Sequence, residues 1–332
     1  MHKEYALGRF ELASGSNLPS ARLAYQTHGE LNGAGDNCIL LPSYYTGTHA
    51  SYEPWIGPGR ILDPSRWFIV AVNMFGNGLS TSPSNAAPAI RGAAFPKITV
   101  ADNVIAQHRL LTSLGVQHIR MIAGWSMGAL QAYEWAVRYP GMVASILPIA
   151  GAAKCSPHNF IFLEGVKAAL QADPAYNQGR YRNQPLDGLR AFGTVYAGWA
   201  YSQEFFRNGT YRDLGYESLN QLLSSWAADH EQMDANNLLA MLDTWQQADV
   251  ATTARGGFED ALRQVEARCI VMPSTTDLYF PAEDSRAETD LLPNAELRPI
   301  ESDLGHLAGR PGIRAAETEQ IGEAMQLLLD RQ

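Results

Sequence analysis

A serine flanked by two glycines is the residue of this sequence whose setting most clearly predicts chemistry. The pattern G-x-S-x-G occupies 124–128, with Ser126 at its centre. It lies between an apolar run at 120–123, typical of a strand, and an amphipathic stretch at 127–137, typical of a helix. A strand that turns directly into a helix holds the serine in a strained backbone conformation, which the small neighbouring residues permit. The turn exposes the hydroxyl as a nucleophile and aims the positive end of the helix at a reacting carbonyl.

A serine hydroxyl needs a base that takes its proton, and the base needs an acid that holds it in the right tautomer. For a serine on this kind of turn, the order along the chain is serine, acid, histidine. His306 follows the last expected strand, so we predict that it is the base. His158 precedes every later strand that could supply the acid. His230 lies in a polar run at 229–232, which favours a solvated position at a helix end.

The acid is expected in a loop that leaves a strand of the same sheet. Asp277 follows the apolar run 268–272 and is the predicted acid. Two further aspartates, Asp284 and Asp303, are weaker candidates for the same role. Asp284 has the position of a first-turn helix residue, where the helix dipole alone favours a carboxylate.

Acyl transfer also needs two backbone donors that stabilise the oxyanion of the transition state. One is expected to be the N–H of Met127, at the head of the helix that follows the serine. The other is expected from the loop after the apolar run 38–41, where we assign it to the N–H of Tyr45.

The surrounding sequence predicts an α/β fold that would position these residues. An opening antiparallel pair of strands and a mostly parallel central sheet flanked by helices are expected. The expected strands are 6–12, 21–27, 38–41, 67–73, 118–123, 144–149, 268–272 and 296–300. From about 156 to 256 helical stretches rich in large apolar residues replace the strand pattern, which predicts an inserted lid. We expect a core formed by 1–154 and 257–332 and a helical lid at 155–256.

Composition and charge argue against several other functions. The 332 residues carry a formal net charge of −9 and no Lys/Arg stripe, which counts against nucleic-acid binding. The glycine-containing loop 75–80 lacks the Gly-Lys-Ser/Thr ending of a phosphate cradle. Cys38, Cys155 and Cys269 are widely spaced, which favours buried free thiols over disulfides or metal ligands. We therefore expect an enzyme that uses neither a metal nor a cofactor.

The ends and apolar runs of the chain bear on its location. The first residues lack the apolar core of a signal peptide. The longest nearly apolar run, 142–153, is too short to span a bilayer. Together with the free thiols, these features predict a cytoplasmic protein that does not associate with a membrane.

With these residues placed, the chain resembles the homoserine O-acetyltransferase family of α/β-hydrolases. The resemblance rests on the segments 23–32, 45–50, 55–59, 73–83, 95–99 and 124–128. It implies the α/β-hydrolase fold, a Ser-His-Asp triad that maps onto Ser126, His306 and Asp277, and a covalent acyl-serine intermediate. It also implies a helical lid and a homodimer assembled through that lid.

Two departures from the family pattern decide the predicted function. In the acetyltransferases an aspartate that helps to hold the amino acid substrate follows the triad histidine, whereas here the position is Leu307. A buried ammonium group without its carboxylate is poorly solvated, which carries a large penalty. The loop that usually reads His-Ala-Leu is Ser43-Tyr44-Tyr45 here, and this changes the pocket wall.

These departures favour a serine carboxylesterase that acts on a small-molecule ester, with acetyl esters preferred. The alternative is an acyl-CoA-dependent O-acyltransferase with an alcohol acceptor. A third interpretation, a non-catalytic binding protein on a hydrolase scaffold, is disfavoured by the presence of all three triad residues in the expected order.

Overall fold

The computed structural model describes residues 2–330, and its centre is an eight-stranded sheet with the order β1-β2-β4-β3-β5-β6-β7-β8. β1 and β2 form an antiparallel pair, β2 is also antiparallel to β4, and the remaining neighbours are parallel. The strands are β1 Lys3–Glu11, β2 Asn17–His28, β3 Cys38–Pro42, β4 Phe68–Val72, β5 Ile119–Trp125, β6 Ser145–Ile149, β7 Arg268–Val271 and β8 Ala295–Leu297. The predicted mostly parallel sheet is therefore confirmed, with β8 shorter than the predicted strand 296–300.

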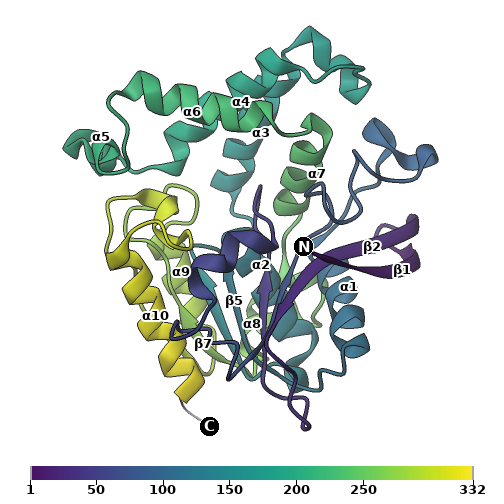
Figure 1. Cartoon of the computed structure of the whole chain (residues 1–332), viewed down its shortest axis with the longest axis vertical. Coiled ribbons are helices and arrows are strands. Elements are labelled where there is room, and N and C mark those ends of the chain that lie inside the picture. Colours follow the sequence, from purple (N-terminus) through teal and green to yellow (C-terminus); the bar gives the residue numbers. More distant parts are fainter. Residues whose placement is uncertain (1, 331–332) are drawn as a thin grey trace.

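The central strands are continuous apolar runs because both of their faces are covered. Every residue of β3, β4 and β6 is buried, as expected for parallel strands between two layers of helices. Helix α2 (Met127–Arg138) packs on β5 and β6, and α10 (Ala315–Asp330) packs against β5, β6 and β7 (Figure 1). Two further helices of the core are α1 (Val100–Ser113) and α9 (Ala282–Thr289).

The start of α1 is fixed by a reciprocal cap. The hydroxyl of Thr99 accepts a hydrogen bond from the N–H of Asp102 at 3.1 Å, and the Asp102 carboxylate accepts one from the N–H of Thr99 at 2.8 Å. The other oxygen of Asp102 accepts a hydrogen bond from the N–H of Ala13. Two otherwise unpaired helix donors are thus satisfied, and the same carboxylate ties α1 to the turn between β1 and β2.

Between β6 and β7 the described chain forms helices and contributes no strand to the sheet. Figure 1 shows α3, α4 and α6 beyond one end of the sheet, above the strands in that view. The helices of this segment are α3 Pro157–Gln171, α4 Leu186–Ala200, α5 Gln203–Asn208, α6 Leu219–Glu231, α7 Ala235–Gln246 and α8 Phe258–Arg263. The division of the chain at 154/155 and 256/257 stays a prediction.

The three cysteines are all buried and free, as predicted, and Cys38 and Cys269 lie in β3 and β7. Among the helices formed by residues 2–330, none combines the length and the apolar character that crossing a bilayer requires.

Candidate active site

Ser126 occupies a sharp turn between the end of β5 and the start of α2. Its backbone angles are φ 57° and ψ −122°, a conformation that non-glycine residues rarely adopt and that stores strain. The two glycines of the motif are required by packing: a Cβ on Gly124 would lie 2.2 Å from the backbone of Gly128, and a Cβ on Gly128 would lie 2.7 Å from the carbonyl oxygen of Pro42. The turn therefore forms only because these positions carry no side chain.

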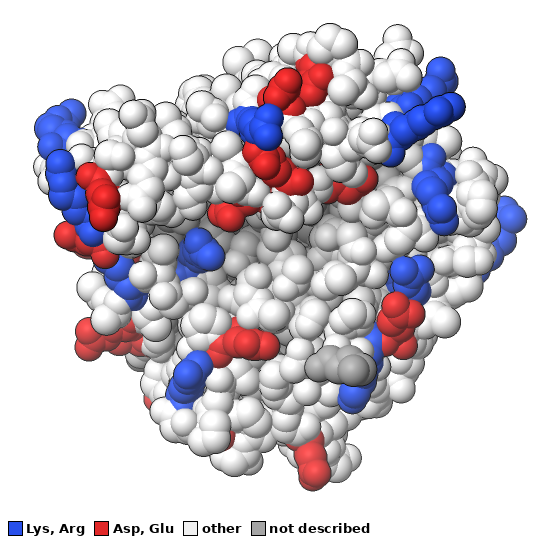
Figure 2. Space-filling view, turned by 45° about the horizontal axis from the view of Figure 1, so that its top comes forward, with Lys and Arg blue, Asp and Glu red and all other residues white. Residues whose placement is uncertain are grey.

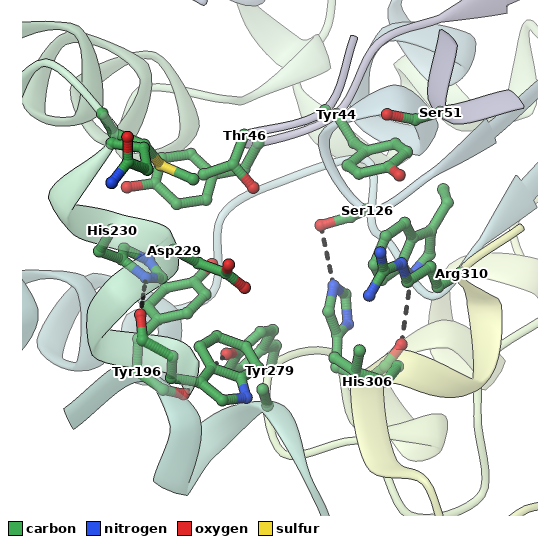
Figure 3. Close-up of a pocket in the computed structure, with 18 residues that line it drawn as sticks. Tyr44, Thr46, Ser51, Ser126, Tyr196, Asp229, His230, Tyr279, His306 and Arg310 are labelled. Carbon is green, nitrogen blue, oxygen red and sulfur yellow. Dashed lines mark hydrogen bonds between the residues drawn. The ribbon is translucent and has the colours of Figure 1, made fainter. Parts of the chain in front are cut away.

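The three predicted side chains meet at this turn. Nε2 of His306 lies 2.9 Å from Oγ of Ser126, and Nδ1 of His306 lies 2.8 Å from Oδ2 of Asp277 (Figure 3). Because a carboxylate can only accept, Nδ1–H donates to Asp277 and Nε2 is left to accept the hydroxyl proton of Ser126. All three residues are buried, with exposed fractions of 4%, 6% and 4% for Ser126, Asp277 and His306.

Asp277 is held by its own loop and by the loop that carries the histidine. Its Oδ1 accepts hydrogen bonds from the N–H groups of Tyr279 at 2.7 Å and Phe280 at 3.2 Å. The neighbouring Thr276 hydroxyl donates to the carbonyl of Ser302 and accepts from the N–H of Gly305. The carboxylate is therefore oriented by backbone donors, and the acid and base loops are bonded to each other.

Of the two residues predicted to supply the oxyanion donors, one follows the serine directly and the other lines its cavity. Met127 is the first residue of α2, so its N–H has no acceptor within the helix and lies at the positive end of the helix dipole. Tyr45 follows β3 and lines the same cavity as Ser126. The assignment of these two N–H groups as oxyanion donors stays a prediction.

A cavity of about 360 Å³ opens above the serine. Its walls come from the loop after β3, from the triad region, and from α4 and α6. Figure 3 shows Asp229 and Arg310 on opposite sides of this space. Figure 2 shows a hollow in the molecular surface, with charged side chains of both signs scattered around its edge. The cavity residues that come from α4, α6 and the turn after α6 are Tyr196, Ala200, Trp226, Asp229, His230, Gln232 and Met233.

The prediction that His230 is solvated at a helix end is wrong, because the residue is buried. It is 4% exposed and lines the cavity. Its Nδ1–H donates to the carbonyl of Trp226 one helical turn earlier, at 2.7 Å, and its ring stacks on the Trp226 indole. Burial lowers the pKa of His230. Helix α6 packs this side against α4, where Gly193 leaves room for the imidazole.

The remaining histidine and aspartate candidates lie outside the triad. His158 is exposed at the start of α3 and its ring contacts Trp199. Asp284 lies in the first turn of α9, as its sequence position suggested. Asp303 forms an ion pair with Arg314 at 3.1 Å, which gives it a structural partner of its own.

Several residues of the site were not found from the sequence. The rings of Tyr279 and Phe280 lie 4.4 Å and 5.6 Å from the His306 ring, centroid to centroid. Arg310 and Asp229 bring the charges described above to the cavity. Only Tyr279 and Phe280 carried a sequence signal, because they lie two and three positions after the predicted acid. Leu307, which the sequence predicts to alter the substrate site, is buried and lines the cavity next to the histidine.

The chain is similar in sequence to known α/β-hydrolases and esterases. A family model described as alpha/beta hydrolase fold matches residues 39–309. A probable esterase of Corynebacterium glutamicum is 41% identical over 308 residues, covering 91% of this chain and 88% of that protein. An ethyl acetate hydrolase of Pseudomonas veronii is 39% identical over 328 residues, covering 97% of this chain and 94% of that protein.

The fold is also similar to that of an esterase of known structure. The acetylester hydrolase of Corynebacterium glutamicum superposes with a TM-score of 0.97 at 38% identity, covering all of this chain and 96% of that one. The homoserine O-acetyltransferase of Nitrobacter hamburgensis also matches, at 32% identity over 330 residues, covering 89% of this chain and 83% of that protein. The resemblance to the acetyltransferases is therefore real but weaker than the resemblance to the esterases.

Proposed function

Since the chain belongs to the α/β-hydrolase family, we propose that it is a serine carboxylesterase that hydrolyses small acyl esters, with acetyl esters as preferred substrates. The observation that carries the proposal is the unbroken series of contacts from Asp277 through His306 to Ser126 at the floor of a cavity. The names of the esterase relatives, an ethyl acetate hydrolase and an acetylester hydrolase, support the acetyl group.

The proposed reaction begins when the ester carbonyl lies against Ser126. Oγ attacks the carbonyl carbon while Nε2 of His306 takes the hydroxyl proton, and the negative charge that develops on the carbonyl oxygen is stabilised by the N–H groups of Met127 and Tyr45. Losing one such donor costs roughly 2.7–4 kcal/mol in other enzymes. Collapse of this intermediate breaks the C–O bond, and the alcohol leaves with the proton that His306 returns.

Water completes the cycle. His306 takes a proton from the water, whose oxygen attacks the acyl-serine carbonyl. The bond to Oγ then breaks, Ser126 recovers its proton from His306, and the carboxylic acid leaves. Asp277 keeps the imidazole in the tautomer that both half-reactions need and stabilises its transient positive charge.

The cavity fits a small substrate. Its volume of about 360 Å³ is at the lower end of the ordinary range for ligand pockets. Tyr196, Tyr279 and Leu307 bring apolar surface close to the serine. Leu307 also argues against the acyltransferase alternative, because it offers no carboxylate to an amino acid acceptor beside the base.

Product analysis tests the proposal directly. The protein is given ethyl acetate and, separately, acetyl-CoA, each with and without homoserine. Release of acetate from the ester at a rate that homoserine does not change supports the esterase. Turnover of acetyl-CoA that depends on an alcohol supports the acyltransferase instead. Failure of a serine-directed fluorophosphonate to label Ser126, together with no turnover, would support a non-catalytic binding protein.

We also propose that the protein is a homodimer assembled through α3 and α4. Four large apolar side chains on these helices are exposed: Phe160 by 48%, Ile161 by 69%, Leu186 by 43% and Val195 by 40%. Contact with a second copy would remove this apolar surface from water. Light scattering coupled to gel filtration tests this, with Ile161→Glu expected to give a monomer and a monomeric wild type as the contrary result.

A further inference from the structure

The residue between Gly124 and Ser126 contacts the proposed catalytic base. The indole of Trp125 stacks on the imidazole of His306, with ring centroids 5.1 Å apart and an interplanar angle of 29°. Its Nε1–H donates to the backbone carbonyl of His306 at 3.2 Å. Trp125 therefore contacts the same residue in two ways, through the ring and through the backbone.

The indole is itself held in place. A second aromatic neighbour is Tyr44, whose ring lies 4.4 Å away at an interplanar angle of 65°. Trp125 is only 5% exposed. A bulky side chain fixed among aromatic neighbours has few rotamers open to it, so the indole is a firm support for the imidazole.

Gly309 provides the space that the indole occupies. A Cβ at this position would lie 2.4 Å from Cδ1 and 2.7 Å from Nε1 of Trp125. Gly309 and His306 belong to the same helical turn, Gly305–Gly309. This turn wraps the edge of the indole, with the His306 carbonyl on the N–H and Gly309 against the ring.

Other aromatic rings support the imidazole as well. Tyr279 and Phe280 contact His306 and follow Asp277, whose carboxylate binds Nδ1. With Trp125 they surround the ring, and Figure 3 shows its Nε2 directed at Ser126. Trp125 is the member of this group that comes from the nucleophile turn itself, so it fixes the base directly to the nucleophile's own backbone.

We propose that Trp125 is a positioning residue for His306, which it reaches through stacking and through the Nε1–H hydrogen bond, and that Gly309 is required for this role. The inference rests on the proposed esterase function. A general base contributes fully only when it is correctly placed, and a misplacement of about 1 Å can cost about 10²-fold in rate. The indole face also favours the positive charge that the imidazole carries when it holds the serine proton.

Trp125 lines the cavity too, so the test must separate positioning from substrate contact. Trp125→Leu removes both the aromatic ring and the N–H, whereas Trp125→Phe removes the N–H and keeps a smaller aromatic ring. Trp226→Leu is the matched control, because Trp226 lines the same cavity but its ring contacts His230, Tyr196 and Tyr201. kcat and KM are measured for ethyl acetate, with the melting temperature of each variant.

The expected result is a split between kcat and KM. Trp125→Leu is expected to lower kcat about 10²-fold with KM changed less than about threefold. Trp125→Phe is expected to recover part of the loss and to remain about tenfold below wild type, the effect of one hydrogen bond. Trp226→Leu is expected to change mainly KM. A Trp125→Leu variant that is folded and changes only KM would overturn the proposal.

Gly309 gives a second test that keeps the tryptophan in the sequence and substitutes no cavity-lining residue. Gly309→Ala is expected to lower kcat about tenfold or more in the wild type, because its Cβ displaces the indole, and less than about twofold in the Trp125→Leu background. Equal losses in both backgrounds would show that Gly309 acts independently of Trp125, and would contradict the inference. The Cβ also approaches Ile149, and the melting temperatures report that effect.

The outcome also distinguishes this inference from the function on which it rests. If wild-type protein hydrolyses ethyl acetate and is labelled at Ser126 by a fluorophosphonate, while folded Trp125→Leu has an unchanged kcat, the positioning role fails and the esterase stands. If the wild type neither hydrolyses the ester nor is labelled, the proposed function itself fails.

Discussion

Nε2 of His306 and Oγ of Ser126 are 2.9 Å apart, although 180 positions separate the two residues in the sequence. The contact depends on a sheet that brings the end of β5 and the loop after β8 to the same edge. The carboxyl ends of parallel strands lie at one edge of the sheet. The loops that leave these strands therefore bring Ser126 and His306 together, although they are far apart in the sequence. Both residues are buried, each with an exposed fraction of 4%.

Removing the nucleophile should abolish turnover without unfolding the protein. Ser126→Ala is expected to lower kcat for ethyl acetate by about 10⁶-fold, as loss of the serine does in an unrelated serine protease, with an unchanged circular dichroism spectrum. Ser51→Ala is the control, since Ser51 is a second serine of the same cavity. Ester hydrolysis at the wild-type rate by Ser126→Ala would remove Ser126 as the nucleophile.

Replacing the acid Asp277 by asparagine should preserve the geometry of the triad but stabilise the wrong tautomer of His306. Asp277→Asn is expected to lower kcat about 10⁴-fold, because an amide N–H facing Nδ1 forces the ring proton onto Nε2. Asp284→Asn, the neighbouring acid in α9, is expected to remain within about twofold of wild type, in line with a surface substitution away from the site. Similar losses in both variants would contradict the assignment of Asp277.

Leu307 offers a test of what shapes the substrate site. Leu307→Asp places a carboxylate among buried groups next to His306 and is expected to lower kcat/KM for ethyl acetate at least about tenfold, since an apolar contact is lost and a charge is buried. Leu307→Met keeps an apolar side chain of similar volume and is the control. Unchanged kcat/KM in Leu307→Asp would show that this wall does not contact the substrate.

Glu288 makes the stability of the protein depend on pH. Its side chain is 8% exposed, both carboxyl oxygens lie 3.0 Å from the N–H of Ala153, and burial raises its pKa to about 8. The folded state therefore holds this proton more tightly than the unfolded state, whose carboxyl has a pKa near its ordinary value of 4.5. The contribution to stability is fully present below pH 4.5 and is lost as the pH rises to about 8.

The Glu288→Gln variant isolates this contribution. Glutamine keeps an oxygen that accepts from Ala153 and carries no charge, so the difference in unfolding free energy between the variant and wild type is expected to grow by a few kcal/mol between about pH 5 and about pH 8.5. Urea unfolding at both pH values measures it. A difference that does not change with pH would contradict the raised pKa of Glu288.

Local sequence signals predicted the elements and the triad because their causes are local. The central strands are apolar runs, the nucleophile turn needs two glycines, and the order serine, acid, histidine left Asp277 and His306 as the best candidates. His230 was misjudged because the polarity of its neighbours says nothing about which side of α6 packs on α4. The support of His306 by Trp125 was missed for a related reason: it depends on a turn 181 residues away, where Gly309 leaves room for the indole.

The hydrogen bonds of Thr276 to Ser302 and Gly305 have a mechanical consequence. They join the segment that bears the carboxylate to the segment that bears the imidazole, so a thermal displacement of one carries the other with it. The Asp277–His306 bond is thereby protected from relative displacement of these two segments, while Trp125 links His306 to the segment that bears the serine. Transfer of the Asp277–His306 pair to another protein scaffold would therefore require that both segments be moved together.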